Sequence, residues 1–313
     1  MNTIDVIIPT YKPGKELTKL IRALFIQVVP VDTVRIINTE EDLFDPELVS
    51  EFGSRVQVRH IPQSEFDHGY ARDLGARESK ADFLMFMTQD AMPCEKDRTL
   101  TQKLTAPMKM DPTIAAAYAR QIPYKNCNRT ERLTRNYNYP PTASVKSADD
   151  LPRLGVKTYF CSNVCAVYRR DVYLKLGGFE HGAIFNEDMV FAAKLIQAGY
   201  RIAYDPLACV RHSHNYSLMQ YFRRSFDMAV SQAEHPEVFA AVSSEKEGAG
   251  MVKTVSKQLL RRKWFFSFLF FFASCVAKYA GYFLGKRYKK LPKRLVRFCT
   301  ASNWWFSRKK AAK

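Results

Sequence analysis

Hydrophobic residues in the N-terminal part of the chain occur in short unbroken runs, and residues 83–87 form the clearest of them. The five apolar residues of this run lead directly into Thr88-Gln89-Asp90. Such a run predicts a strand buried on both faces of a parallel sheet, and ligands of such sheets bind beyond the carboxyl ends of the strands. Asp90 is therefore a candidate ligand for a divalent cation that carries phosphates, although an isolated Asp after a strand more often only begins a loop.

Apolar runs alternate with helical periodicity along this part of the chain. Strands are predicted over residues 3–10, 34–37, 55–61, 83–91, 114–120, 159–168 and 200–204. Helices are predicted over residues 15–27, 98–110, about 170–176 and 186–198, with a further helix after Gly69. Residues 121–158 show little periodicity, so we expect a long functional loop over the site. The order of elements predicts an α/β nucleotide-binding fold with a mostly parallel central sheet.

The formal net charge of +17 is confined to one end of the chain. Residues 251–313 contain 17 Lys and Arg and no Asp or Glu, whereas residues 1–250 are neutral overall. We therefore predict a catalytic domain over residues 1–242, a linker over residues 243–250 and a basic amphipathic helical segment over residues 251–313.

The seven cysteines are scattered, and no C-x-x-C pair occurs among them. This pattern predicts neither a disulfide framework nor a zinc site. The N-terminus also lacks the charged start, apolar core and cleavage site of a secretory signal. We therefore expect a cytosolic, reduced protein.

A glycine-containing segment follows the third predicted strand. Gly69 allows a tight turn, and Ala71 and Gly75 suit a helix that packs closely on the sheet. Arg72 would project near the start of this helix, where the exposed backbone amides already favour an anion. The alternative is an ordinary surface ion pair between Arg72 and Asp73.

Asn186-Glu187-Asp188 precede a helix that we expect to end at Gly199. Asn186 can cap this helix, and the two acidic residues lie in its first turn, where negative charge is favourable. Capping accounts for Asp188 as well as catalysis does.

Together these motifs resemble those of family 2 glycosyltransferases, which are inverting nucleotide-sugar enzymes of the GT-A fold. The matching segments are Val6-Ile7-Ile8-Pro9-Thr10-Tyr11, Gly69-Tyr70-Ala71-Arg72-Asp73-Leu74-Gly75, and Gly177-Gly178-Phe179 followed by Glu187-Asp188. The segments that resemble the rhamnosyltransferase branch are Phe66-Asp67-His68-Gly69, Leu84 with Thr88-Gln89-Asp90-Ala91, and His212-Ser213-His214. The resemblance extends over roughly residues 3–230 and depends on the order of the motifs.

The resemblance implies a role for each candidate residue. Asp188 would be the catalytic base, and Asn163 and Glu187 would lie on the acceptor side. A divalent metal, Mg²⁺ or Mn²⁺, would bind Asp90 and His212, with His214 as the alternative to His212. The donor would contact Pro9, Thr10, Tyr11, Asn38, Glu40, Asp67, Arg72, Gln89 and Asp90.

The chain departs from the family pattern in two places. The usual Asp-x-Asp is reduced to Thr88-Gln89-Asp90, and the acid that commonly ends the second strand is replaced by Asn38, with Glu40 nearby. The candidate base is intact, and a carboxylate at a helix N-terminus is expected to stay ionised at neutral pH. Asp188 would accept a proton from the attacking hydroxyl while a cation on Asp90, together with Arg72, stabilises the departing diphosphate.

The implied reaction is hexosyl transfer, with L-rhamnose from dTDP-L-rhamnose as the expected donor group. The acceptor would be a lipid-linked saccharide or a polysaccharide in cell-surface glycan biosynthesis. Two alternatives stay open, namely another donor such as a UDP-hexose, and a non-catalytic scaffold that keeps the fold and binds a nucleotide or a partner.

The basic segment contains an aromatic block, with seven Phe and Trp within residues 264–272. The apolar stretch reaches Leu284 only if Lys278 is included, and basic clusters flank it at 261–263 and 286–290. A membrane span would place one cluster outside, so we predict a helix in the anionic inner-leaflet interface and a peripheral protein on the cytoplasmic face. Nucleic-acid binding is the rival explanation for the positive charge of this segment. The aromatic residues of nucleic-acid-binding proteins, however, are usually spaced along a basic groove rather than gathered in one block. A helix packed on its own catalytic domain or on a second subunit is the remaining alternative.

Overall fold

The computed structural model describes residues 2–94, 98–240 and 245–311. The chain divides into two compact units, each assembled from separate stretches. Unit 1 comprises Met1–Ile122, Tyr139–His181 and Glu187–His212. Unit 2 comprises Pro123–Asn138, Gly182–Asn186 and Ser213–Lys313. Among the candidate site residues, His214 alone lies in unit 2.

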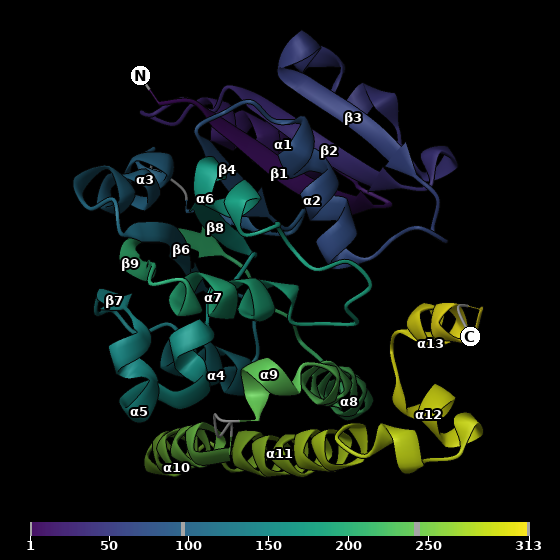
Figure 1. The fold of residues 1–313 in the computed structure, drawn as a ribbon. Helices are drawn as coiled ribbons and strands as arrows, with labels where there is room; N and C mark the ends of the chain where they lie inside the picture. Colours follow the sequence, from purple (N-terminus) through teal and green to yellow (C-terminus); the bar gives the residue numbers. More distant parts are fainter. Residues whose placement is uncertain (1, 95–97, 241–244, 312–313) are drawn as a thin grey trace. The chain divides into compact units, whose positions relative to one another are not determined.

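Unit 1 is built on a nine-stranded sheet (Figure 1). Its strands are β1 (Ile4–Tyr11), β2 (Thr33–Thr39), β3 (Val56–Ile61), β4 (Phe83–Met87), β5 (Met92–Pro93), β6 (Ile114–Ile122), β7 (Ser144–Lys146), β8 (Cys165–Arg169) and β9 (Arg201–Arg211). Their spatial order is β3-β2-β1-β4-β8-β6-β9-β5, and β7 pairs with β9. The predicted strand over residues 159–168 is thus limited to β8, whereas the one predicted over residues 200–204 continues to the end of β9.

The prediction of a mostly parallel sheet is confirmed, because six strands, β1, β2, β3, β4, β6 and β9, run in one direction. Strands β1 to β4 are parallel, and β6 is parallel to β9. Strand β8 lies antiparallel between β4 and β6, and β5 and β7 are antiparallel to β9. Cys165 pairs with Met87, so the chain enters β8 at the same carboxyl edge at which it leaves β6. Without a crossover to the other edge, the strand must run antiparallel.

Helices cover the sheet of unit 1, and those outside residues 121–158 follow the predicted ranges closely. They are α1 (Lys15–Phe25), α2 (His68–Glu78), α3 (Leu100–Met110), α5 (Leu151–Leu154), α6 (Arg170–Lys175) and α7 (Glu187–Gln197). Short 3₁₀ helices are η1 (Glu41–Leu43), η2 (Pro46–Leu48), η3 (Ser50–Arg55), η4 (Ala148–Asp150) and η5 (Gly155–Tyr159). The apolar residues of α1 that gave the helical period are buried, as an amphipathic helix requires.

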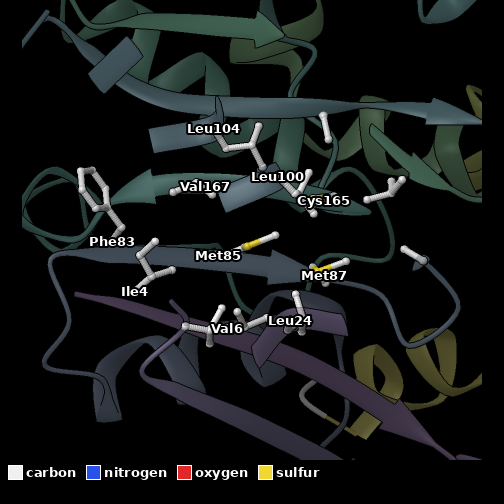
Figure 2. Packing of buried hydrophobic residues seen from close by; sticks show 14 of the residues in the cluster. Ile4, Val6, Leu24, Phe83, Met85, Met87, Leu100, Leu104, Cys165 and Val167 are labelled. Atoms are coloured by element: carbon white, nitrogen blue, oxygen red, sulfur yellow. The ribbon is translucent and has the colours of Figure 1, made fainter. Parts of the chain in front are cut away.

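Strand β4 is buried along its whole length, and its two faces pack differently. Met85 lies in an aliphatic cluster with Leu24 of α1 and Leu100 of α3 (Figure 2). Phe86 points to the opposite face, where its ring centroid lies 4.9 Å from that of Phe179 within a group of aromatic side chains. The unbroken apolar run therefore marks a strand that has a core on both sides, as predicted.

The described part of unit 2 is helical. Its elements are α4 (Arg129–Asn138), α8 (Leu218–Glu234), α9 (Pro236–Phe239), α10 (Glu245–Arg261), α11 (Phe265–Gly285), η6 (Tyr288–Lys290), α12 (Lys293–Cys299) and α13 (Asn303–Ala311). Helix α11 packs closely along α8 at two glycines. A Cβ atom on Gly281 would lie 2.2 Å from the main-chain oxygen of Phe222, and one on Gly285 would lie 2.4 Å from that of Phe226.

The prediction that residues 121–158 form a long loop is wrong. They contain α4, β7, η4 and α5, and continue into η5. Asn128 caps α4, since its Oδ1 accepts a hydrogen bond from the Glu131 N–H (2.8 Å). Leu133 is the only aliphatic residue of α4 and packs against Val255 and Leu259 of α10. Hydrophobic periodicity gave no signal because the helix has this single aliphatic residue.

The predicted linker over residues 243–250 is also corrected in part. Residues 243–244 lie outside the described residues, whereas 245–250 form the start of α10. After this polar start, α10 carries Met251, Val255 and Leu259. Their spacing of four places them on one helix face, which packs on α11. The long C-terminal stretch of unit 2 begins at Ser213 rather than after residue 242, because α8 packs on α11.

The close contact of α11 with α8 predicts opposite effects for one substitution at two helical glycines. Gly281→Ala should lower the free energy of unfolding by about 1–3 kcal/mol, because the added methyl group overpacks the contact. Gly248→Ala in α10, where a Cβ would have no neighbour within 4 Å, should raise it by about 0.5–1 kcal/mol through helix propensity. Urea unfolding of both variants tests this, and equal effects would contradict the packing.

Candidate active site

The carboxyl ends of β1, β2 and β4 are joined by side-chain hydrogen bonds. Thr10 Oγ1 donates to Asn38 Oδ1 (2.9 Å) between β1 and β2. Gln89, which follows β4, accepts from the Tyr11 N–H (2.9 Å) and donates to the Tyr11 carbonyl oxygen (3.1 Å). These four predicted donor-binding residues therefore lie together at one edge of the sheet, the position where nucleotides bind in such folds.

Three other predicted donor-binding residues lie within β1, after β2 and after β3. Pro9 lies within β1, and Glu40 follows β2 at a φ of +66°. A side-chain oxygen of Glu40 accepts from the Gln63 N–H. Asp67 caps α2, where its Oδ1 accepts from the N–H three residues further on (2.7 Å). Both carboxylates shape turns, and their contact with a donor stays a prediction.

Asp90 and His212 meet at this edge of the sheet. β9 ends at Arg211, and the Nε2 atom of His212 lies 3.5 Å from Asp90 Oδ2. The His212 side chain is 9% exposed and that of Asp90 is 47% exposed, so one ligand atom is fixed and the other is open to solvent. A carboxylate and an imidazole that converge in this way can share a cation.

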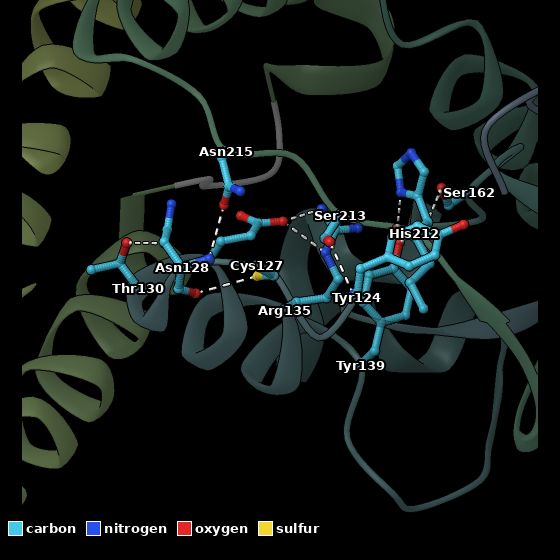
Figure 3. A network of polar contacts seen from close by, with 12 residues as sticks. Tyr124, Cys127, Asn128, Thr130, Arg135, Tyr139, Ser162, His212, Ser213 and Asn215 are labelled. Carbon is cyan, nitrogen blue, oxygen red and sulfur yellow. Dashed lines mark hydrogen bonds and ion pairs between the residues drawn. The ribbon is translucent and has the colours of Figure 1, made fainter.

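Gln121 determines which nitrogen of His212 carries the proton, and Figure 3 labels His212 with two further partners of Gln121, Tyr139 and Ser162. Its Nε2 donates to the Tyr139 hydroxyl and to Ser162 Oγ (3.1 Å), so its Oε1, 2.9 Å from His212 Nδ1, must accept. The Nε2 lone pair of His212 then faces the Asp90 carboxylate. Metal-binding histidines typically donate their other N–H to a fixed acceptor, so this arrangement fits a metal site.

The alternative ligand His214 lies in unit 2, where its ring stacks on Tyr216 with 4.9 Å between ring centroids. The contact with Asp90 within unit 1 favours His212, and the choice between the two histidines stays a prediction.

Arg72 and Glu187 form a buried ion pair that joins α2 to α7. Arg72 Nη1 lies 2.7 Å from Glu187 Oε1, and the side chains are 5% and 10% exposed. The same nitrogen donates to the carbonyl oxygen of His68 (3.3 Å). The guanidinium of Arg72 was expected to point toward a bound anion. It pairs with Glu187 instead, because a buried Arg needs a compensating charge. Arg72 Nε is buried without a hydrogen-bond partner and is the atom that a ligand could still engage.

Asp188 lies directly beside this ion pair in the first turn of α7. Its Oδ1 accepts from the Met189 N–H (2.8 Å), and its Oδ2 accepts from the Asn163 N–H (3.4 Å). Burial and, after it, the negative charge of Glu187 raise the pKa of Asp188 to about 7, although Arg72 and the two amides lower it. Desolvation therefore outweighs the effect of the helix N-terminus, and Asp188 is ionised only in part at neutral pH. A carboxyl group with a pKa near neutrality is suited to general acid–base chemistry.

Asn163 links the start of β8 to Asp188. Its Oδ1 accepts from the Tyr168 hydroxyl (2.9 Å), while its main-chain N–H donates to Asp188. Its Nδ2 is buried without a hydrogen-bond partner. An unsatisfied donor in a buried position beside a carboxylate indicates where a hydroxyl-bearing ligand could bind. This is consistent with the acceptor-side role implied by the resemblance, which stays a prediction.

Sequence reasoning missed Gln121, Tyr139 and Ser162, which orient His212. Gln121 is 91 residues from His212 in the chain, and the other two lie in or next to the region predicted as a loop. The signal available was a polar residue at the end of the apolar run of β6, where site residues of such sheets gather.

Comparison with known proteins identifies the family of this chain. The sequence model of glycosyl transferase family 2 matches residues 5–177, which is more than half of the chain. The chain belongs to this family. It is therefore a glycosyltransferase, and the resemblance noted in the sequence is confirmed.

Two curated relatives match almost the whole glycosyltransferase. The O-antigen chain rhamnosyltransferase RfbN of Salmonella typhimurium is 36% identical over 309 residues, covering 96% of each chain. The O-antigen chain rhamnosyltransferase WbaN of Salmonella anatum is 36% identical over 313 residues, covering 97% of this chain and 96% of that one.

Solved structures with the same fold include two glycosyltransferases. The mannosyltransferase PcManGT from Pyrobaculum calidifontis, in complex with GDP-Man and Mn²⁺, has a TM-score of 0.57 at 15% identity and covers 91% of this chain and 88% of its own. GalNAc-T7 with UDP, GalNAc and Mn²⁺ has a TM-score of 0.53 at 15% identity and covers 82% and 54%. The predicted GT-A fold is thus confirmed.

The raised pKa of Asp188 predicts a pH-dependent cost to stability. From about pH 4 to pH 7 the folded protein keeps a proton that the unfolded chain loses, so stability falls as pH rises through this window. Asp188→Asn removes this cost. The free energy of unfolding of the variant, relative to that of the wild type, should therefore rise by on the order of 2 kcal/mol when the pH is raised from about 4.5 to about 8. Urea unfolding at both pH values measures this. A difference that does not change with pH would contradict the raised pKa.

Proposed function

We propose that this glycosyltransferase transfers L-rhamnose from dTDP-L-rhamnose, with inversion, to a saccharide acceptor of a cell-surface glycan. The observation that carries the proposal is the 36% identity to O-antigen chain rhamnosyltransferases. This identity extends over nearly the entire chain, including the part after residue 177 that the family match does not cover.

We propose that Asp188 is the base that accepts the proton of the attacking hydroxyl. Its pKa of about 7 leaves much of it ionised at neutral pH and still basic enough to take a proton. The Arg72–Glu187 pair fixes α7 against α2 and so holds Asp188 at the edge of the sheet. Asn163, with its buried Nδ2, would orient the acceptor hydroxyl toward Asp188.

The proposed donor site is the edge formed by the Thr10–Asn38 and Tyr11–Gln89 hydrogen bonds. A divalent cation, Mg²⁺ or Mn²⁺, would be held by Asp90 and His212, with His214 as the alternative to His212. When bound, the cation would offset the negative charge of the departing nucleoside diphosphate. His212 compensates in this proposal for the carboxylate missing from Thr88-Gln89-Asp90.

We further propose that the acceptor is a lipid-linked saccharide and that the protein attaches peripherally to the cytoplasmic face of the membrane. The support is the excess of Lys and Arg in residues 251–313 and the apolar helix α11. Among the described residues, α11 is the one helix long and apolar enough to cross a membrane.

The donor and the base can be tested together. The wild type should transfer sugar from dTDP-L-rhamnose and not measurably from UDP-glucose. Asp188→Asn should reduce transfer by roughly 10² to 10⁴, the usual contribution of a positioned base, and leave the affinity for dTDP unchanged. Transfer is followed by mass spectrometry of the acceptor and affinity by calorimetry. Transfer from UDP-glucose alone would overturn the donor assignment, and near-wild-type transfer by the variant would remove Asp188 from the mechanism.

The metal site predicts a loss of metal-dependent nucleotide binding. Asp90→Ala should weaken dTDP binding in the presence of Mn²⁺ to the level seen with EDTA, because the diphosphate loses its anchored cation. Asp171→Ala is a matched control, since this exposed acid follows β8 at the opposite edge of the sheet. Calorimetry with and without Mn²⁺ gives both affinities. Unchanged Mn²⁺-dependent binding in Asp90→Ala would contradict the assignment.

A further inference from the structure

Helix α11 has two faces of different character. Phe271, Ser274, Gly281 and Gly285 are buried, and the two glycines contact α8. The other face exposes large apolar side chains, among which Phe266 is 89% exposed. Its residues are Phe265, Phe266, Leu269, Phe272, Val276, Tyr279 and Phe283. Their spacing of three and four places them in one stripe along the helix, which we call the aromatic stripe.

The one charged residue of α11 does not interrupt this stripe. Lys278 is turned toward α8, where its Nζ lies 4.2 Å from the centroid of the Tyr221 ring. Burial by these neighbours lowers the pKa of Lys278. The aromatic stripe is therefore uncharged along its length. An exposed apolar surface of this extent is rare on soluble proteins and normally marks an interaction site.

A basic hollow adjoins the C-terminal end of the stripe. This cavity of about 610 Å³ is bordered by Tyr279 and Phe283 of the stripe and by four cations. The cations are Lys286, Arg287, Lys289 and Lys290. Glu234 of α8 pairs with Lys289 Nζ (2.8 Å), and the hollow keeps an excess of positive charge. A concave cluster of cations beside exposed aromatic rings matches a phosphate headgroup attached to a hydrocarbon chain.

We propose that the aromatic stripe and the basic hollow together dock flat on an anionic phospholipid bilayer. The stripe would lie among the upper parts of the acyl chains, and the hollow would receive headgroup phosphates. This inference deepens the membrane attachment proposed above and rests on it, because it names the surface and the lipid chemistry that provide the attachment.

The packing of α11 supports a flat orientation over a transmembrane one. Helix α8 is bound along the inner face of α11 and carries Arg223, Arg224, Asp227 and Glu234. A spanning α11 would draw these charges into the hydrocarbon, which is costly for each of them. A flat helix leaves α8 on the aqueous side and keeps the basic residues at both ends of α11 near the headgroups.

The charge distribution also favours a bilayer over a second copy of the chain. Residues 251–313 contain 17 Lys and Arg and no acid, so two such surfaces would repel each other. An anionic membrane supplies both the apolar layer and the opposite charge. Salt should therefore weaken docking without abolishing it, since the apolar contribution is not screened.

The test is co-sedimentation of the full chain with vesicles of phosphatidylcholine, with or without phosphatidylglycerol. The Phe266→Ser and Phe272→Ser double variant should bind phosphatidylglycerol vesicles at least about tenfold more weakly, most clearly at high salt. Its matched control, Met110→Ser, changes a residue that is 85% exposed in α3 of unit 1 and should bind like the wild type.

The hollow is tested by removing its charge. Lys286→Gln, Arg287→Gln and Lys290→Gln combined should weaken binding about tenfold at low salt and remove the preference for phosphatidylglycerol. The control is the same change at Lys15, Lys80 and Lys109, three exposed cations of unit 1, which should have a small effect.

Three results would overturn the inference: wild-type binding by the double Phe variant, equal losses in a variant and its control, or a dimer that covers the stripe in sedimentation without vesicles. Binding of dTDP, measured on the same variants, should be unchanged. A failure of docking with intact nucleotide binding would leave the proposed transferase standing.

Discussion

The buried ion pair between Arg72 and Glu187 is the interaction on which the active site depends. It joins α2 to α7 and sets the environment of Asp188, the next residue in the chain. Removing either partner would leave an unpaired buried charge, which lowers the free energy of unfolding. The two partners also act in opposite directions on the pKa of Asp188, because Glu187 raises it while Arg72 lowers it. One contact thus contributes to both the position and the proton affinity of the proposed base, in addition to the burial of Asp188.

The sheet places the remaining groups around this pair. β1, β2 and β4 run parallel, so the residues that follow them gather at one edge. The chain enters β8 and leaves β9 at the same edge, which brings Asn163 and His212 there as well. The antiparallel insertion of β8 is therefore needed for the site, since a parallel β8 would begin at the opposite edge with Asn163.

Sequence alone predicted the elements whose signal is local. The apolar run of β4, the periodicity of α1 and the glycines around α2 each mark their element within a few residues. Prediction from the sequence failed for elements whose formation depends on tertiary contacts. Helix α4 has one aliphatic residue and a cap at Asn128, and α10 begins with polar residues, so neither was recognisable without its packing partner. For the candidate site, motif order pointed to Asp90, Asp188 and His212, whose roles stay predictions, but no local pattern connects Gln121 to His212. The raised pKa of Asp188 was not predicted, because its burial cannot be read from its place at a helix start.

The most direct test of this account is the pH dependence of single-turnover sugar transfer in the wild type and in Glu187→Gln. The wild-type rate should rise with pH through about 7, as Asp188 loses its proton. In Glu187→Gln the repulsion from Glu187 is gone and the charge of Arg72 acts on Asp188 uncompensated, so the midpoint should move to lower pH. A midpoint that is the same in both proteins would contradict the claim that this ion pair sets the base.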